Sequence, residues 1–153
     1  MKFFSSTLAA LLLCSISAGC DAVSPLEVPT YAYTAYNEAG MPVVTGFLQF
    51  TISPIEGSNW TYTGSIEGSR YLSPVEGIES AGMYSHTQEN SLQGSVNWNG
   101  GVWIDFNPGT FDSNIILNGS FERENNQGDL TGDWHYSTIV GGVGGGRFEA
   151  KRR

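Results

Sequence analysis

The stretch Leu117-Asn118-Gly119-Ser120-Phe121 carries a pattern that decides the fold class of this chain. A glycine lies midway between two large apolar residues, with one residue of any type on each side of the glycine. The pattern recurs at residues 44–48, 62–66, 92–96 and 130–134. Each copy is flanked by alternating apolar and polar residues, which is typical of a β-strand with one buried face. The copies are irregularly spaced, so they predict a set of similar strands and not a repeat array.

The glycine of each copy lies on the apolar row of its strand, because successive side chains point to opposite faces. Glycine weakens a strand unless the backbone bends there or approaches another segment closely. Five such strands therefore predict a tightly coiled sheet of the kind found in small barrels. We expect an all-β fold, an antiparallel up-and-down meander barrel of about eight strands, with a two-sheet sandwich as the alternative.

The segments between the expected strands predict short connections. Asn99-Gly100 is the strongest hairpin signal in the chain. The run of glycines at 141–146 predicts a flexible loop before a last strand at Arg147–Lys151. Residues 79–89 are the least strand-like segment, so we expect a loop or a single helical turn there.

Two strands resemble those of a known family. Leu130-Thr131-Gly132-Asp133-Trp134 is similar to the Leu-Thr-Gly-x-Trp/Tyr strands of the avidin family. The last strand, Arg147-Phe148-Glu149-Ala150-Lys151, resembles the closing strand of such barrels. The barrel as a whole is also similar to lipocalin-like up-and-down barrels. The resemblance implies the fold class. It carries over no binding residue, because the polar biotin-binding positions have no match in this chain.

The first twenty residues have the pattern of an export signal. Lys2 supplies a positive charge and residues 3–16 are apolar or small, a stretch too short to span a bilayer. The following Ser17-Ala18-Gly19-Cys20 resembles the lipobox of bacterial lipoproteins, which implies that Cys20 is diacylated and begins the mature chain. Ser17 departs from the aliphatic residue usual there. The alternative is an ordinary secretory signal cut after Ala22.

These features predict the domain organisation. Residues 1–19 form the signal peptide, 20–29 a lipid-anchored tether and 30–153 a single barrel domain. Cys14 lies within the signal and Cys20 is the expected lipid site, so no thiol remains for a disulfide or a metal cluster. We expect no metal and no cofactor. The location is a bacterial cell envelope, in either the inner or the outer membrane.

The charge balance excludes one class of partner. The chain has 7 Lys+Arg against 15 Asp+Glu and a formal net charge of −8, whereas nucleic-acid binding needs a basic face. Four of the seven cations lie at residues 147–153. This basic stretch is either a contact for anionic lipid headgroups or an exposed terminus.

Aromatic residues are the candidates for ligand binding. Trp60, Tyr62, Trp98, Trp134 and Tyr136 fall on the glycine rows, so we expect them to point into the barrel. An aromatic-lined barrel can hold a small apolar ligand. The alternative is that they fill the core, since the interior of about eight strands is only just filled by side chains. Trp103 has the opposite register and is expected at the surface.

No catalytic motif is present, and we expect no catalytic residue. His86 and His135 lie far apart and match no zinc spacing, and no nucleophile elbow occurs. Several carboxylates could form a glycosidase pair, but surface charges explain them more simply. These carboxylates are Asp105, Glu122, Asp129, Asp133 and Glu149.

Three functions follow from these features. The first is a lipid-anchored, non-enzymatic envelope barrel that binds a small apolar molecule or a protein. The second is a purely structural envelope lipoprotein with a filled core. The third is a glycan-acting enzyme with a carboxylate site at the barrel mouth.

Overall fold

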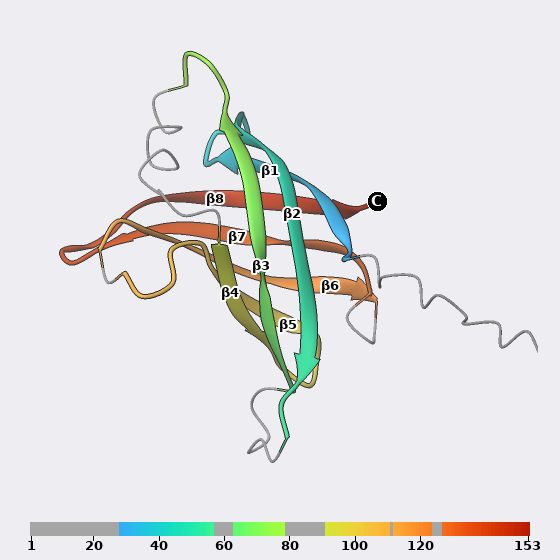
Figure 1. Cartoon of the computed structure of the whole chain (residues 1–153). Helices are drawn as coiled ribbons and strands as arrows, with labels where there is room; N and C mark the ends of the chain where they lie inside the picture. The colour runs from blue at the N-terminus through green and yellow to red at the C-terminus, as the bar shows by residue number, and fades with distance from the viewer. Residues whose placement is uncertain (1–27, 57–62, 79–90, 111, 124–126) are drawn as a thin grey trace, which may run out of the picture.

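A computed structural model describes residues 28–56, 63–78, 91–110, 112–123 and 127–153. These residues form eight strands that close into one antiparallel barrel (Figure 1). Each strand pairs with its sequence neighbours, and the first strand pairs with the last. The strands are β1 Thr30–Asn37, β2 Pro42–Pro54, β3 Gly64–Pro74, β4 Ser91–Val96, β5 Gly101–Asp105, β6 Asn114–Arg123, β7 Gln127–Thr138 and β8 Gly141–Arg152. The predicted all-β meander barrel is confirmed. The alternative, a two-sheet sandwich, does not occur, because the eight strands form one closed sheet.

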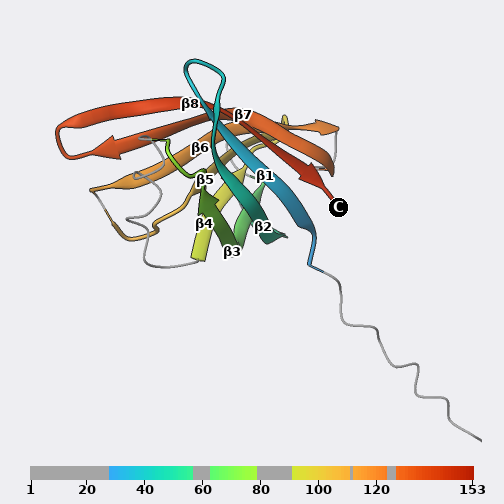
Figure 2. The same ribbon diagram turned by 90° about the horizontal axis from the view of Figure 1, so that it is seen from above.

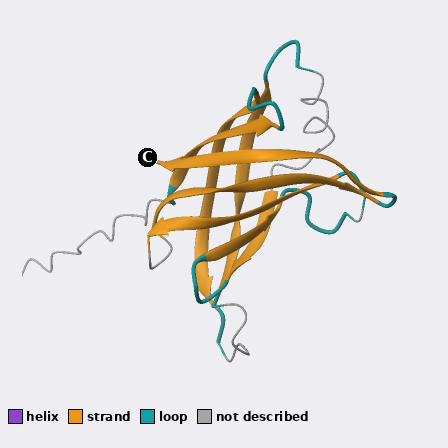
Figure 3. Ribbon diagram, turned by 180° about the vertical axis from the view of Figure 1, so that it is seen from behind, coloured by secondary structure: helices purple, strands orange, loops and turns teal. Residues whose placement is uncertain are grey.

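The alternating strand directions give the barrel two ends. The Thr30 end holds the start of β1, the turn between β4 and β5, and the end of β8. The opposite end, here named the Ile139 end, holds the β1–β2 turn and the β7–β8 turn. Figure 2 shows β7 and β8 reaching beyond their neighbours toward the Ile139 end, and Figure 3 shows the same hairpin from behind.

The barrel interior is a hydrophobic core built by every second residue of each strand. On β1, Tyr31, Tyr33 and Ala35 are buried, while the residues between them are partly exposed. The partners in register follow the same rule, so Tyr31 lies opposite Leu48 and Leu117 lies opposite Trp134. Burial of this apolar area is the main force that holds the sheet closed.

Inward glycines permit the tight coiling that the sequence predicts. A Cβ added to Gly132 would overlap the backbone of Asn118 and lie 2.5 Å from the Cα of Gly119, its partner on β6. A Cβ on Gly94 would overlap the carbonyl oxygen of Trp103 on β5. Neighbouring strands therefore approach more closely at these positions than any side chain allows.

The glycine run 141–146 corrects the sequence prediction. It is not a loop, because it forms the first half of β8 and pairs with β7 through Gly142–Ser137, Gly144–Tyr136 and Gly146–Trp134. The prediction used the low strand propensity of glycine. Here the partner strand carries Trp134, and Gly146 opposite it leaves space for the indole, because a Cβ there would lie 3.0 Å from Nε1.

Candidate functional site

Trp134 and Tyr136 occupy the interior as predicted. Trp134 is fully buried, and its Nε1–H donates a 2.8 Å hydrogen bond to the carbonyl oxygen of Tyr36 on β1. The indole reaches β1 across β8 at Gly146, where a Cβ would lie 3.0 Å from Nε1 and would overlap the same carbonyl. Tyr136 is partly buried and packs against the core. Trp134 is therefore a core residue that joins three strands.

Trp98 corrects the prediction that it points inside. Its side chain is 75% exposed, because the alternation of β4 ends at Val96 and Trp98 lies in the turn that follows. Asn97 closes this turn. Its N–H donates to the carbonyl of Gly101 at 2.9 Å, and its Oδ1 accepts the Gly101 N–H at 2.6 Å.

Three predicted positions lie outside the described residues. Trp60 and Tyr62 belong to the segment between β2 and β3, and Cys20 precedes the first described residue. Trp103 is exposed, in agreement with its predicted register.

Aromatic rings pack against one another across the interior. The rings of Tyr31 and Phe50 stack with a centroid distance of 4.7 Å and an interplanar angle of 1°. Tyr33 meets Phe106 at 5.8 Å and Phe148 at 5.9 Å. Burial raises the pKa of the Tyr31 phenol above its usual value, and the charges of Arg152 and Asp129 act in opposite directions on it. These rings therefore belong to the hydrophobic core of the barrel.

Arg70 is the interior residue that the sequence reading missed. It lies on β3 opposite Leu48, is only 2% exposed, and places its guanidinium carbon 5.5 Å from the centroid of Phe106. A cation over an aromatic face is favoured by the ring quadrupole, more strongly when water is excluded. The signal was present, because Arg70 shares its row with Ile66 and Gly68.

A groove on the outside of β1, β2 and β3 is the candidate binding site. It encloses about 720 Å³ and is here named the wall groove. Phe47 and Tyr71 are both exposed and lie directly opposite each other on β2 and β3. The guanidinium carbon of Arg153 lies 4.6 Å from the Phe47 centroid. The remaining lining residues are Ala32, Tyr33, Thr34, Thr45, Gly46, Leu72 and Ser73.

The wall groove combines two kinds of contact. The two aromatic rings offer flat apolar area, and Thr34, Thr45 and Ser73 offer hydroxyl donors and acceptors. The groove exists because its floor consists of small side chains between the rings and the neighbouring strand. The sequence alone does not identify this groove, because its lining comes from three strands and from Arg153, and only the strand register brings these residues together.

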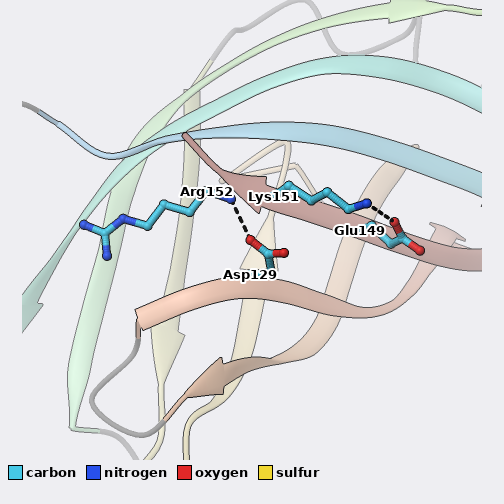
Figure 4. A network of polar contacts seen from close by, with 4 residues as sticks. All are labelled: Asp129, Glu149, Lys151 and Arg152. Atoms are coloured by element: carbon cyan, nitrogen blue, oxygen red, sulfur yellow. Dashed lines mark hydrogen bonds and ion pairs between the residues drawn. The ribbon is translucent and has the colours of Figure 1, made fainter.

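Three of the five carboxylates considered for catalysis, Asp105, Asp129 and Glu149, make local structural contacts. Oδ1 of Asp129 accepts the backbone N–H of Arg152 at 2.9 Å, and Glu149 forms an ion pair with Lys151 at 3.5 Å (Figure 4). Oδ1 of Asp105 accepts the N–H of Asn107 at 2.8 Å. Among the described residues, no group of three His, Cys, Asp or Glu side chains is placed to hold a metal ion.

Comparisons with protein-family models, with curated proteins and with solved structures find no match. No helix within the described ranges has the length and apolar content needed to cross a membrane.

Proposed function

We propose that the protein is a lipid-anchored, non-enzymatic component of a bacterial cell envelope that binds its ligand on the outer wall of the barrel. The observation that carries this proposal is the contrast between the two surfaces of the sheet. The inner surface is occupied by stacked aromatic rings, while exposed Phe47 and Tyr71 line a groove outside. A ligand reaches the wall groove without displacing any of the core.

The ligand class that fits the wall groove is a carbohydrate chain. Sugar rings have apolar C–H faces that stack on aromatic side chains, and their hydroxyl groups exchange hydrogen bonds with residues such as Thr45 and Ser73. Arg153, packed on Phe47, adds a cation that suits an acidic sugar or a phosphate substituent. Envelope polysaccharides supply all of these groups.

Binding to purified envelope oligosaccharides, measured by calorimetry, tests the groove. We expect Tyr71→Ala to weaken binding about fivefold or more, because truncation of a central aromatic contact typically costs over about 1 kcal/mol. Trp103→Ala is the matched control, since it removes an exposed ring from β5 and should leave binding unchanged. Equal losses in the two variants, or no binding by the wild type, would refute the wall groove.

The anchor is tested separately. Mass spectrometry of the protein from its native bacterium should find a diacylated Cys20, and Cys20→Ser should release the protein from the membrane fraction. An unmodified chain beginning at Val23 would refute the anchor and leave the wall groove untouched.

A structural envelope lipoprotein is the second candidate, and the packing of aromatic rings within the core favours it. The two candidates differ in the calorimetry, because a purely structural barrel has no reason to bind glycans through Tyr71.

A further inference from the structure

The wall groove is ordered along the barrel axis in three rows of outward-facing residues. The row nearest the Thr30 end pairs Thr30 with Gln49, and the N–H of Arg153 donates to the Thr30 carbonyl at 2.9 Å. The middle row holds Ala32, Phe47 and Tyr71. The third row, toward the Ile139 end, holds Thr34, Thr45 and Ser73. A cation, two aromatic rings and a set of hydroxyl groups therefore follow one another from the Thr30 end.

Strand β8 adds charges to the same rows. Lys151 lies opposite Ala32 in the middle row, and Glu149 lies opposite Thr34 in the third row. Lys151 and Glu149 form an ion pair at 3.5 Å, whereas Arg153 is paired with no carboxylate among the described residues. Cations therefore flank the two rows nearest the Thr30 end, and a carboxylate flanks the third. An anion is favoured at the Thr30 end of the wall groove and repelled at its other end.

The Thr30 end is also where the proposed anchor joins the barrel. The start of β1 lies beside the end of β8, with Tyr31 opposite Arg152 (Figure 1). Cys20 precedes Thr30 by ten positions, so even a fully extended chain places Cys20 at most about 35 Å from this end. A lipid on Cys20 therefore holds the cationic end of the wall groove within reach of the membrane surface.

We propose that the wall groove binds the headgroup of a glycolipid in which a phosphate joins the sugar to the lipid, an inference that rests on the proposed function. The phosphate contacts Arg153, and the first sugar ring stacks on Phe47 and Tyr71. The next sugar exchanges hydrogen bonds with Thr45 and Ser73. From the membrane outward, such a lipid presents phosphate, first sugar and later sugars in the order of the three rows. A guanidinium suits phosphate, because it donates several charge-assisted hydrogen bonds.

The order of chemical groups selects this ligand over simpler ones. A neutral glycan would use the rings and hydroxyl groups but would leave Arg153 without an anion. A glycan with an acidic group far from the lipid would place its charge in the third row beside Glu149, where it is repelled. A soluble sugar phosphate would match the first two rows but would gain nothing from the nearby anchor.

Calorimetry of the detergent-extracted full protein tests the role of the phosphate. The probes are a polyprenyl phosphoglucose and a polyprenyl glucoside, which has the same lipid and sugar without the phosphate. We expect the phosphate-linked probe to bind about tenfold tighter, the gain expected of one charge-assisted contact. Equal affinities would overturn this inference alone, provided that the wild type binds envelope oligosaccharides. Absence of binding to the oligosaccharides and to both probes would refute the proposed function as well.

Substitutions locate the phosphate within the groove. Arg153→Gln should remove most of the preference for the phosphate-linked probe, whereas Tyr71→Ala should weaken the binding of both probes. Arg147→Gln is the matched control, because Arg147 is an exposed cation on the same strand and does not line the wall groove. The control should keep the full preference. A preference that survives Arg153→Gln, or that is lost equally in Arg147→Gln, would overturn the assignment.

Glucose 1-phosphate distinguishes a lipid headgroup from a soluble ligand. It carries the same sugar and a phosphate but no lipid, so it is not concentrated in the micelle that holds the anchor. We expect it to bind at least about tenfold more weakly than the polyprenyl phosphoglucose. Equal affinity for the two would overturn the membrane source of the ligand and assign the groove to a soluble sugar phosphate.

Discussion

Glycines in the closed part of the barrel and glycines in the β7–β8 extension have opposite surroundings. A Cβ on Gly132 would overlap the backbone of β6, whereas a Cβ on Gly142 would make only an ordinary contact. The first glycine lies where two strands must approach closely, and the second lies on a strand with one open side. Glycine therefore permits close approach of two strands in the closed barrel, whereas in the extension it leaves the backbone of β8 uncovered by a side chain.

The largest expected effect comes from filling the closed region. Gly132→Val should destabilise the protein by roughly 3 kcal/mol, at the upper end of overpacking costs, because the added atoms meet backbone on β6 that cannot move aside. Urea denaturation measures the loss. Gly142→Val is the matched control and should change stability by less than about 0.5 kcal/mol. Equal losses for the two variants would remove the distinction between the regions.

A smaller effect is expected where the two regions meet. Trp134→Phe should cost about 1–2 kcal/mol, because the buried carbonyl of Tyr36 loses the hydrogen bond from Nε1. Thermal unfolding measures this loss. Trp98→Phe changes an exposed indole in the same way and serves as the control. A Trp134→Phe protein as stable as the wild type would show that the contact across Gly146 adds nothing to the closure of β1 on β8.

The pH dependence of stability probes the closed interior. Burial raises the pKa of the Tyr31 phenol above its unfolded value of 10.0, so the folded state favours the neutral form. This contribution is fully present below pH 10 and is lost as the pH rises through the raised folded value. Tyr31→Phe should therefore lose less stability than the wild type as the pH rises above 10.0. Identical pH profiles would place the phenol in contact with water.

The smallest expected effect has the opposite sign. Gly142→Ala should stabilise the protein by about 0.4–1 kcal/mol, because it restricts the unfolded chain at a position with space for a methyl group. The change is read as a shift of the urea midpoint. Destabilisation instead would mean that the extension is packed as tightly as the barrel.

The strands and the barrel were predictable because their signal is local. The alternation around copies such as 92–96 and 117–121 identifies buried faces, and the inward glycines indicate how strongly the sheet coils. The glycine run of β8 was predicted wrongly, because its strand conformation depends on Trp134 and Tyr136 of the neighbouring strand. The pairing of β8 with β7 gives these glycines a strand conformation that their local propensity does not predict.

The candidate sites were less predictable than the fold. Trp98 was placed inside because the alternation was extended two residues beyond Val96, into a turn closed by Asn97. The wall groove needs the register of three strands to bring Phe47 beside Tyr71 and Arg153. Arg70 was missed although its row in the sequence, shared with Ile66, indicates an inward side chain. Sites assembled from separate strands become visible only when the register is known.

The seam between β1 and β8 has a consequence for the order of folding. Tyr31 pairs with Arg152, and the Arg153 N–H donates to the Thr30 carbonyl at 2.9 Å, so the barrel closes by joining segments far apart in the sequence. Contacts of such separation form slowly, since a long loop must be ordered before they form. β1 therefore has no final partner on one side until β8 has emerged. A chain built this way stays open throughout its synthesis and closes in one late step.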